Sequence, residues 1–177
     1  DSASAVDVIN VLRKLRSGNL YFTIEDEKKH YKNVFRQLSS LGFNLIIKLH
    51  PSEDIELFKT YIKSDKVKFI KDGNLSDLTI ESDIILGEYT TAFFYPIKYL
   101  KPIIIVKSKF FEKYPFNFTD FGIGVEADVD KLSMIIPNAL TLSANQKNNY
   151  DIFLKNHIGK NSIASHDYFF KIIKEIN

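Results

Sequence analysis

Short runs of β-branched and other apolar residues alternate along this chain with longer segments of helical periodicity. The runs predict strands at residues 20–24, 43–49, 67–70, 84–87 and 103–106. Between them, apolar residues recur at helical spacing, as in the stripe between residues 31 and 41. Nearly continuous apolar strands are typical of a parallel sheet that is covered on both faces. The pattern therefore predicts an α/β fold with a doubly wound parallel sheet.

The ends of the chain show weaker patterns than the middle. Helical spacing at residues 5–15 predicts an N-terminal helix inside a linker of residues 1–18. Residues 19–142 then form the predicted sheet domain, which ends with a short strand at 122–125 and a helix at 129–140. After a polar linker at 143–149, we expect the C-terminal segment 143–177 to form helices that pack on this domain or cross to another one.

Composition excludes several classes of protein. The chain has 177 residues and is 45% hydrophobic, enough for one domain with a real core. Lys and Arg number 24 against 22 Asp and Glu, a near balance that argues against nucleic acid as a partner. With no cysteine, the chain has neither a disulfide nor a thiolate metal site. The chain begins at Asp1 rather than Met, so we expect a fragment of a longer protein. Its apolar runs are all shorter than the roughly 18 residues that span a bilayer.

Two predicted strands end at polar groups that suit a phosphate. The run 43–49 stops at His50 and Pro51, and the run 84–87 is followed by Thr90 and Thr91. Ligands of open parallel sheets bind outside the carboxyl ends of the strands, so these groups predict one shared site. A histidine can donate a hydrogen bond to a phosphate or protonate a leaving group. The hydroxyls begin a predicted helix, where they either bind an anion or only cap the helix.

Further polar groups follow predicted strands at the same edge of the sheet. Glu88 is a candidate for binding ribose hydroxyls. The turn Lys71-Asp72-Gly73 after the third predicted strand either contacts a nucleobase or ribose or is a simple turn. The acids Glu25, Asp26 and Glu27 follow the first predicted strand. One of them either acts as a general base or binds a sugar hydroxyl, or all three form a solvated first turn of a helix. We interpret the remaining histidines, His30, His157 and His166, as surface residues, because none has a partner at metal-ligand spacing.

Familiar phosphate-binding and nucleophile motifs are missing. The sequence has no G-x-G-x-x-G after the first predicted strand and no G-x-x-x-x-G-K-[ST]. It also has no G-x-S-x-G motif. A dinucleotide site, a P-loop NTPase and an α/β-hydrolase are therefore not expected.

Three segments together resemble a known family. They are Lys48-Leu49-His50-Pro51, the stretch from Ser82 to Pro96 that contains Glu88-Tyr89-Thr90-Thr91, and the stretch from Tyr99 to Val106. They are similar to the C-terminal nucleotide-binding domain of GT-B glycosyltransferases, and most of all to bacterial sialyltransferases and polysialyltransferases. The resemblance implies a Rossmann-like sheet that is one half of a GT-B fold.

The resemblance also implies an activity. The enzyme would transfer sialic acid from CMP-sialic acid to a bacterial surface glycan, a lipooligosaccharide or capsule. His50 would contact the donor phosphate and act as acid toward the departing CMP, and Thr90 and Thr91 would hold the same phosphate. No metal or other cofactor would be needed, and the CMP-sugar would be the substrate.

The resemblance places the rest of the reaction outside this chain. The glycan acceptor and the general base would belong to a missing N-terminal domain, so we expect the chain alone to be inactive. Such an enzyme would be cytoplasmic. Peripheral contact with the inner membrane, through the aromatic and basic loop at 107–121, and a homodimer both stay open.

Two alternatives stay open. The same layout of motifs occurs in CDP-glycerol glycerophosphotransferases of teichoic-acid synthesis, which also use a cytidine nucleotide. A non-catalytic flavodoxin-like or receiver-like module would explain Asp72 and Lys107 near the ends of the third and fifth predicted strands. Such a module has no use for His50-Pro51 and would end soon after Val106, whereas this chain continues for a long stretch.

Overall fold

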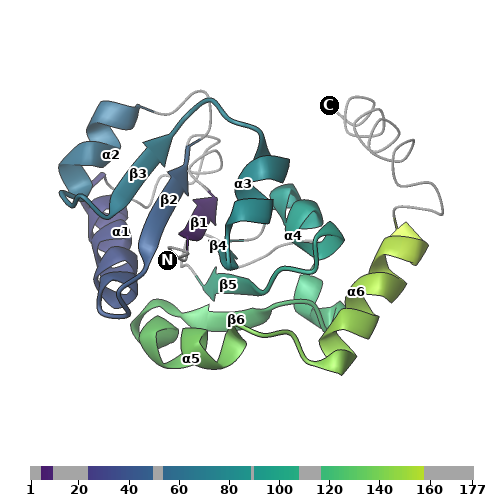
Figure 1. Cartoon of the computed structure of the whole chain (residues 1–177). Coiled ribbons are helices and arrows are strands. Elements are labelled where there is room, and N and C mark those ends of the chain that lie inside the picture. The colour runs from purple at the N-terminus through teal and green to yellow at the C-terminus, as the bar shows by residue number, and fades with distance from the viewer. Residues whose placement is uncertain (1–4, 10–23, 50–53, 89, 108–116, 158–177) are drawn as a thin grey trace.

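The structure is a three-layer arrangement of helices around a parallel sheet (Figure 1). It is a computed structural model that describes residues 5–9, 24–49, 54–88, 90–107 and 117–157. Its strands are β1 (Ala5–Ile9), β2 (Asn44–Lys48), β3 (Val67–Ile70), β4 (Ile84–Gly87), β5 (Ile103–Lys107) and β6 (Val125–Asp128). They form one sheet in the order β3-β2-β1-β4-β5-β6, and every neighbouring pair is parallel. The predicted doubly wound parallel α/β sheet is confirmed.

Helices cover both faces of this sheet. The α-helices are α1 (Ile24–Ser39), α2 (Ile55–Tyr61), α3 (Leu75–Glu81), α4 (Phe94–Lys98), α5 (Leu132–Ala139) and α6 (Ala144–His157). Short 3₁₀ turns are η2 (Thr91–Phe93), η3 (Phe118–Phe121) and η4 (Val129–Lys131). Residues of α1, α2 and α5 share a core with one face of the sheet, whereas α4 and α6 share a second core with the other face. Helix α3 packs beside α4.

Strand β4 shows why its sequence is apolar at every position. Ile84 and Leu86 belong to the core on the α1 face, and Ile85 belongs to the core on the α4 face. All three side chains are fully buried. Successive side chains of a strand point to opposite faces, so a strand with two covered faces has no solvent-facing position. The same rule produces the apolar run of β5.

The predicted helix at residues 5–15 is wrong for Ala5–Ile9, which form β1 at the centre of the sheet. Pairing with β2 on one side and β4 on the other outweighs the helical spacing of so few residues. Of the predicted strand 20–24, residues 20–23 lie outside the described residues, and Ile24 begins α1. The sheet therefore includes residues of the predicted linker 1–18.

Two predictions near the C-terminus also need correction. The predicted strand at 122–125 begins only at Val125, because Gly122 and Gly124 adopt left-handed φ values of 65° and 71°. The predicted polar linker at 143–149 lies largely within α6. A reciprocal cap starts this helix: Gln146 N–H donates to the Ser143 hydroxyl, and Ser143 N–H donates to the Gln146 side chain.

Tyr150 anchors α6 and makes the stability of the chain sensitive to alkaline pH. Its side chain is fully buried, and this burial raises the pKa of the phenol well above its ordinary value of 10.0. In the unfolded chain the phenol ionises from about pH 10, so the unfolded state then binds fewer protons and the folded state loses stability as pH rises further.

We expect the free energy of unfolding to fall more steeply above about pH 10 in the native sequence than in Tyr150→Phe. Urea unfolding at pH 8, 10 and 11 measures the difference. Parallel pH curves for the two proteins would contradict the prediction.

Candidate functional site

The order of the strands reverses between β1 and β4, which are neighbours at the centre of the sheet. The chain moves outward from β1 through β2 to β3 and then returns to place β4 on the other side of β1. At the carboxyl ends of these strands, Ile9 is in register with Gly87. Ligands of open α/β sheets bind at such a switch point, outside the carboxyl ends of the strands. The candidate site therefore lies just beyond Ile9 and Gly87.

Glu88, the first residue after β4, has a buried carboxylate at this switch point. Its side chain is 6% exposed, and Oε1 lies 3.2 Å from Nε2 of His30 on α1. The His30 side chain is only 14% exposed, so its interpretation as a surface histidine is wrong. A carboxylate is rarely buried unless it is paired. A buried acid at a ligand-binding edge is typical of a functional group that must be held in one orientation.

Thr90 and Thr91 follow at the same edge of the sheet. Thr90 is half-buried, and its hydroxyl accepts a hydrogen bond from Ala92 N–H at 3.2 Å, so it caps the turn η2. Thr91 is exposed. The helix that they introduce is only a 3₁₀ turn followed by the short α4, so its dipole adds little. What both residues present at the site is a hydroxyl group, since the Thr90 O–H can still donate while its oxygen caps the turn.

Strands β2 and β3 end beside each other on one side of the switch point. Lys48 Nζ donates hydrogen bonds to the carbonyls of Leu49 and Lys71, at 2.8 and 2.7 Å, and so ties these two ends together. Lys71 is half-buried, whereas Asp72 and Gly73 are exposed. Three strand spacings separate β3 from β4, about 14 Å in all. The structure thus brings Lys71–Gly73 to the predicted edge but not next to Glu88.

Some predicted site residues cannot be placed at this edge. His50 and Pro51 lie outside the described residues, as does Tyr89. Glu25 is in the first turn of α1, which runs from the carboxyl edge of the sheet toward the amino edge, and Asp26 beside it is exposed. The acids therefore lie at the start of α1, and the strand expected directly before them at 20–23 lies outside the described residues.

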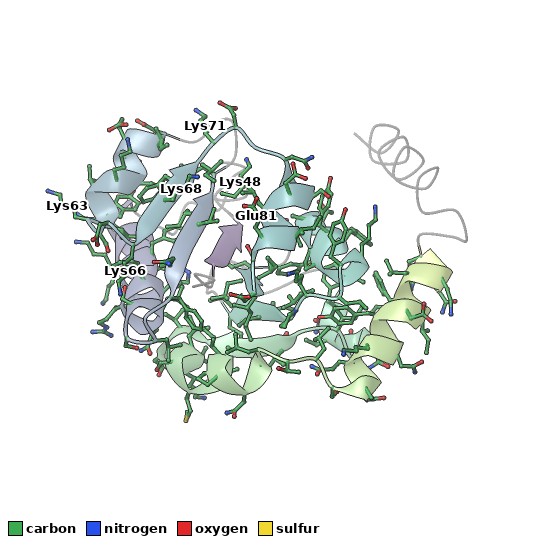
Figure 2. All side chains as sticks on the ribbon, in the orientation of Figure 1. Lys48, Lys63, Lys66, Lys68, Lys71 and Glu81 are labelled. Atoms are coloured by element: carbon green, nitrogen blue, oxygen red, sulfur yellow. The ribbon has the colours of Figure 1, made fainter. Side chains whose placement is uncertain are left out.

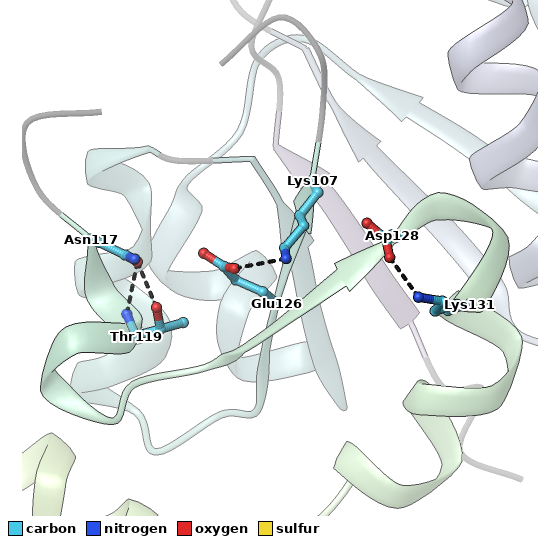
Figure 3. A network of polar contacts seen from close by, with 6 residues as sticks. All are labelled: Lys107, Asn117, Thr119, Glu126, Asp128 and Lys131. Carbon is cyan, nitrogen blue, oxygen red and sulfur yellow. Dashed lines mark hydrogen bonds and ion pairs between the residues drawn. The ribbon is translucent and has the colours of Figure 1, made fainter. Parts of the chain in front are cut away.

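A polar network that sequence reasoning missed occupies the other side of the switch point, at the ends of β5 and β6 (Figure 3). Lys107 Nζ lies 3.2 Å from Glu126 Oε2. Nearby, Lys131 donates a hydrogen bond of 2.9 Å to Asp128, which lowers the pKa of Asp128 and raises the pKa of Lys131. Both residues of the second pair are solvent-exposed, so we interpret it as a local surface ion pair where β6 turns into η4 rather than as part of the site.

A hollow of about 300 Å³ lies at the opposite edge of the sheet, where β2 and β3 begin. Its lining includes Ile46 of β2, Lys66 and Lys68 at the start of β3, and Glu81 at the end of α3, and Figure 2 labels the last three. The polar groups at the switch point do not reach it. Among the residues that the structure describes, no group of three or more His, Asp or Glu could hold a metal ion, and no helix has the length and apolarity to cross a bilayer.

Solved structures share this fold at low sequence identity. The calicheamicin glycosyltransferase CalG4 matches 93% of this chain with a TM-score of 0.63 and 9% identity. The spinosyn forosaminyltransferase SpnP matches 99% with a TM-score of 0.60 and 15% identity. The Methanocaldococcus jannaschii UDP-GlcNAc 2-epimerase, solved with UDP-GlcNAc and UDP, matches 84% with a TM-score of 0.56 and 12% identity.

The chain spans only part of these proteins: 39% of CalG4, 44% of SpnP and 43% of the epimerase. No protein-family model matches the chain, and no curated protein matches its sequence. The strand order 3-2-1-4-5-6 differs from the 2-1-3-4-5 order of flavodoxin-like and receiver-like modules, so the fold is neither of these. The chain has a Rossmann-like α/β fold that forms one half of a GT-B fold.

Proposed function

We propose that this chain is the donor-nucleotide domain of a GT-B glycosyltransferase. The observation that supports this proposal is the row of polar groups that follows β4 at the switch point, Glu88 with its buried carboxylate and Thr90 with its capping hydroxyl. A nucleotide-sugar offers ribose hydroxyls to a carboxylate and phosphate oxygens to hydroxyl donors. SnogD from Streptomyces nogalater, a glycosyltransferase, has this fold at 13% identity and a TM-score of 0.58.

The proposed roles follow from this chemistry. Glu88 accepts hydrogen bonds from ribose hydroxyls, and Thr90 and Thr91 donate to the phosphate. His50 contacts the same phosphate and protonates the departing nucleotide. The remaining predicted site groups contact the base or the sugar, namely Lys71, Asp72, Gly73, Glu25 and Asp26.

The finer proposal is transfer of sialic acid from CMP-sialic acid to a bacterial surface glycan, lipooligosaccharide or capsule, without a metal. It is supported by the spacing of His50-Pro51 and the hydroxyl pair. The acceptor would bind a separate N-terminal domain in a cytoplasmic enzyme that is inactive as this chain alone. Peripheral contact with the inner membrane and a homodimer belong to the same proposal.

Calorimetric titration of the chain with CMP, CDP, UDP and dTDP tests the proposal. The panel includes UDP because the epimerase structure contains it, and dTDP because the glycosyltransferase VinC was solved with it. We expect CMP to bind most tightly. His50→Ala and the double variant Thr90→Val/Thr91→Val should each weaken binding tenfold or more, about 1.4 kcal/mol. Thr60→Val, on the exposed surface of α2, is the matched control.

Each outcome has a distinct meaning. Preference for CDP over CMP would favour the glycerophosphotransferase alternative. Preference for UDP or dTDP would contradict sialyl transfer but keep a nucleotide-sugar donor. Failure of the folded chain to bind any of the four nucleotides would contradict the proposed function.

A further inference from the structure

The contact between the His30 imidazole and the Glu88 carboxylate joins α1 to the switch point. The two residues are far apart in sequence, yet Nε2 of the imidazole lies 3.2 Å from Oε1 of the carboxylate. With side chains 14% and 6% exposed, the pair is shielded from most of the solvent. Shielding strengthens such a hydrogen bond relative to one at the surface. The orientation of the Glu88 carboxylate is therefore determined partly by α1.

The His30 ring is itself held in place by aromatic packing. It makes an edge-on contact with Tyr31, with ring centroids 5.4 Å apart at 81°. Tyr31 is buried and packs in turn against Phe58 of α2, at 5.3 Å. Rings packed in this way rarely change rotamer without disturbing the core. The histidine thus has the rigidity that a group orienting another side chain needs.

We infer that His30 is a positioning residue, which sets the Glu88 carboxylate in the orientation that binds the ribose of the donor nucleotide. This inference rests on the proposed function, because it concerns the same site. His30 acts through Glu88: Nε2–H donates to Oε1 and fixes the plane of the carboxylate. The arrangement needs a hydrogen-bond donor at that point, and a neutral imidazole with its proton on Nε2 supplies one as well as a charged imidazole does.

Variants of His30 can separate the need for a hydrogen-bond donor from the need for a positive charge. In His30→Gln, the side-chain amide can place an N–H donor near the position of Nε2 without a positive charge. In His30→Leu, a side chain of similar size has no donor. His157→Leu is the matched control, since His157 lies on α6 and its ring contacts are with Phe121 and Phe153, on the second core rather than at the switch point.

The test is calorimetric titration of each variant of the full chain with CMP, CDP, UDP and dTDP, followed by a double-mutant cycle with Glu88→Gln. We expect His30→Leu to weaken binding of the preferred nucleotide about tenfold or more, the effect of losing one hydrogen bond to a charged group. His30→Gln should stay within about threefold of the native chain, and His157→Leu should not differ from it. In the Glu88→Gln background, His30→Leu should have a much smaller effect, because the two residues act as a unit.

Several outcomes would overturn the inference. One is native affinity in His30→Leu, and another is an equal loss in His30→Gln and His30→Leu. Full additivity in the cycle would show that His30 does not act through Glu88. Thermal unfolding of each variant shows whether it is folded, and the His30→Gln comparison and the cycle remain decisive if His30→Leu does not fold. A native chain that binds no nucleotide refutes the proposed function, whereas binding that is indifferent to His30 refutes only the inference.

Discussion

Replacing Leu86 by alanine is expected to lower the free energy of unfolding by about 2–5 kcal/mol. Leu86 is fully buried on β4, where it lies in register with Val8 of β1 and Ile104 of β5. Truncation removes apolar contacts and leaves a cavity that strands paired on both sides cannot easily fill. Because single domains are stable by only about 5–15 kcal/mol, this loss is a large part of the total.

Urea unfolding measures the effect as a lower midpoint with an unchanged slope. Leu57→Ala is the matched control: Leu57 lies on α2 with 37% of its surface exposed, and alanine is a good helix former. We expect this control to cost less than about 1 kcal/mol. Similar losses in both variants would mean that the centre of the sheet is not the most tightly packed part of the chain.

Most of the sheet could be predicted because its strands have local signals. Strands β2 to β5 are short apolar runs with polar or glycine boundaries, and each lies within about two residues of its predicted place. Strand β1 could not be recognised in this way. Its few residues also fit a helix, and only pairing with β2 and β4, which are distant in sequence, makes them a strand.

The candidate site was predictable in its location but not in its contacts. The rule that ligands bind at the carboxyl ends of parallel strands predicts a site at Glu88, Thr90 and Thr91, and in the structure these residues follow β4. Their role in binding stays a prediction. That rule does not show which side chains from helices reach the edge. The predicted surface position of His30 is wrong because no local pattern connects this residue to Glu88, which is distant in the sequence.

Removing both His30 and Glu88 tests whether the fold needs this pair, because the change in the free energy of unfolding differs between a pair that supports the fold and one that serves a ligand. Replacing a buried pair by apolar residues of similar size is often neutral or stabilising by about 1–4 kcal/mol, whereas removing one partner is destabilising. A pair that serves ligand binding is retained although it does not maximise stability. We therefore expect His30→Leu/Glu88→Leu to unfold at a urea concentration equal to or above that of the native chain, and His30→Leu alone to lose about 1–3 kcal/mol.

The same double variant should lose nucleotide binding by a factor of about one hundred or more, since both the ribose acceptor and its support are gone. The exposed pair Lys59–Glu56 on α2 supplies the control, because Lys59→Ala/Glu56→Ala should change stability by less than about 1 kcal/mol and leave binding intact. A double variant at His30 and Glu88 that loses several kcal/mol of stability would identify the pair as a structural support of the sheet edge. Retained stability with lost binding would instead mean that selection keeps a buried carboxylate at the switch point for its ligand, because the fold has no need of it.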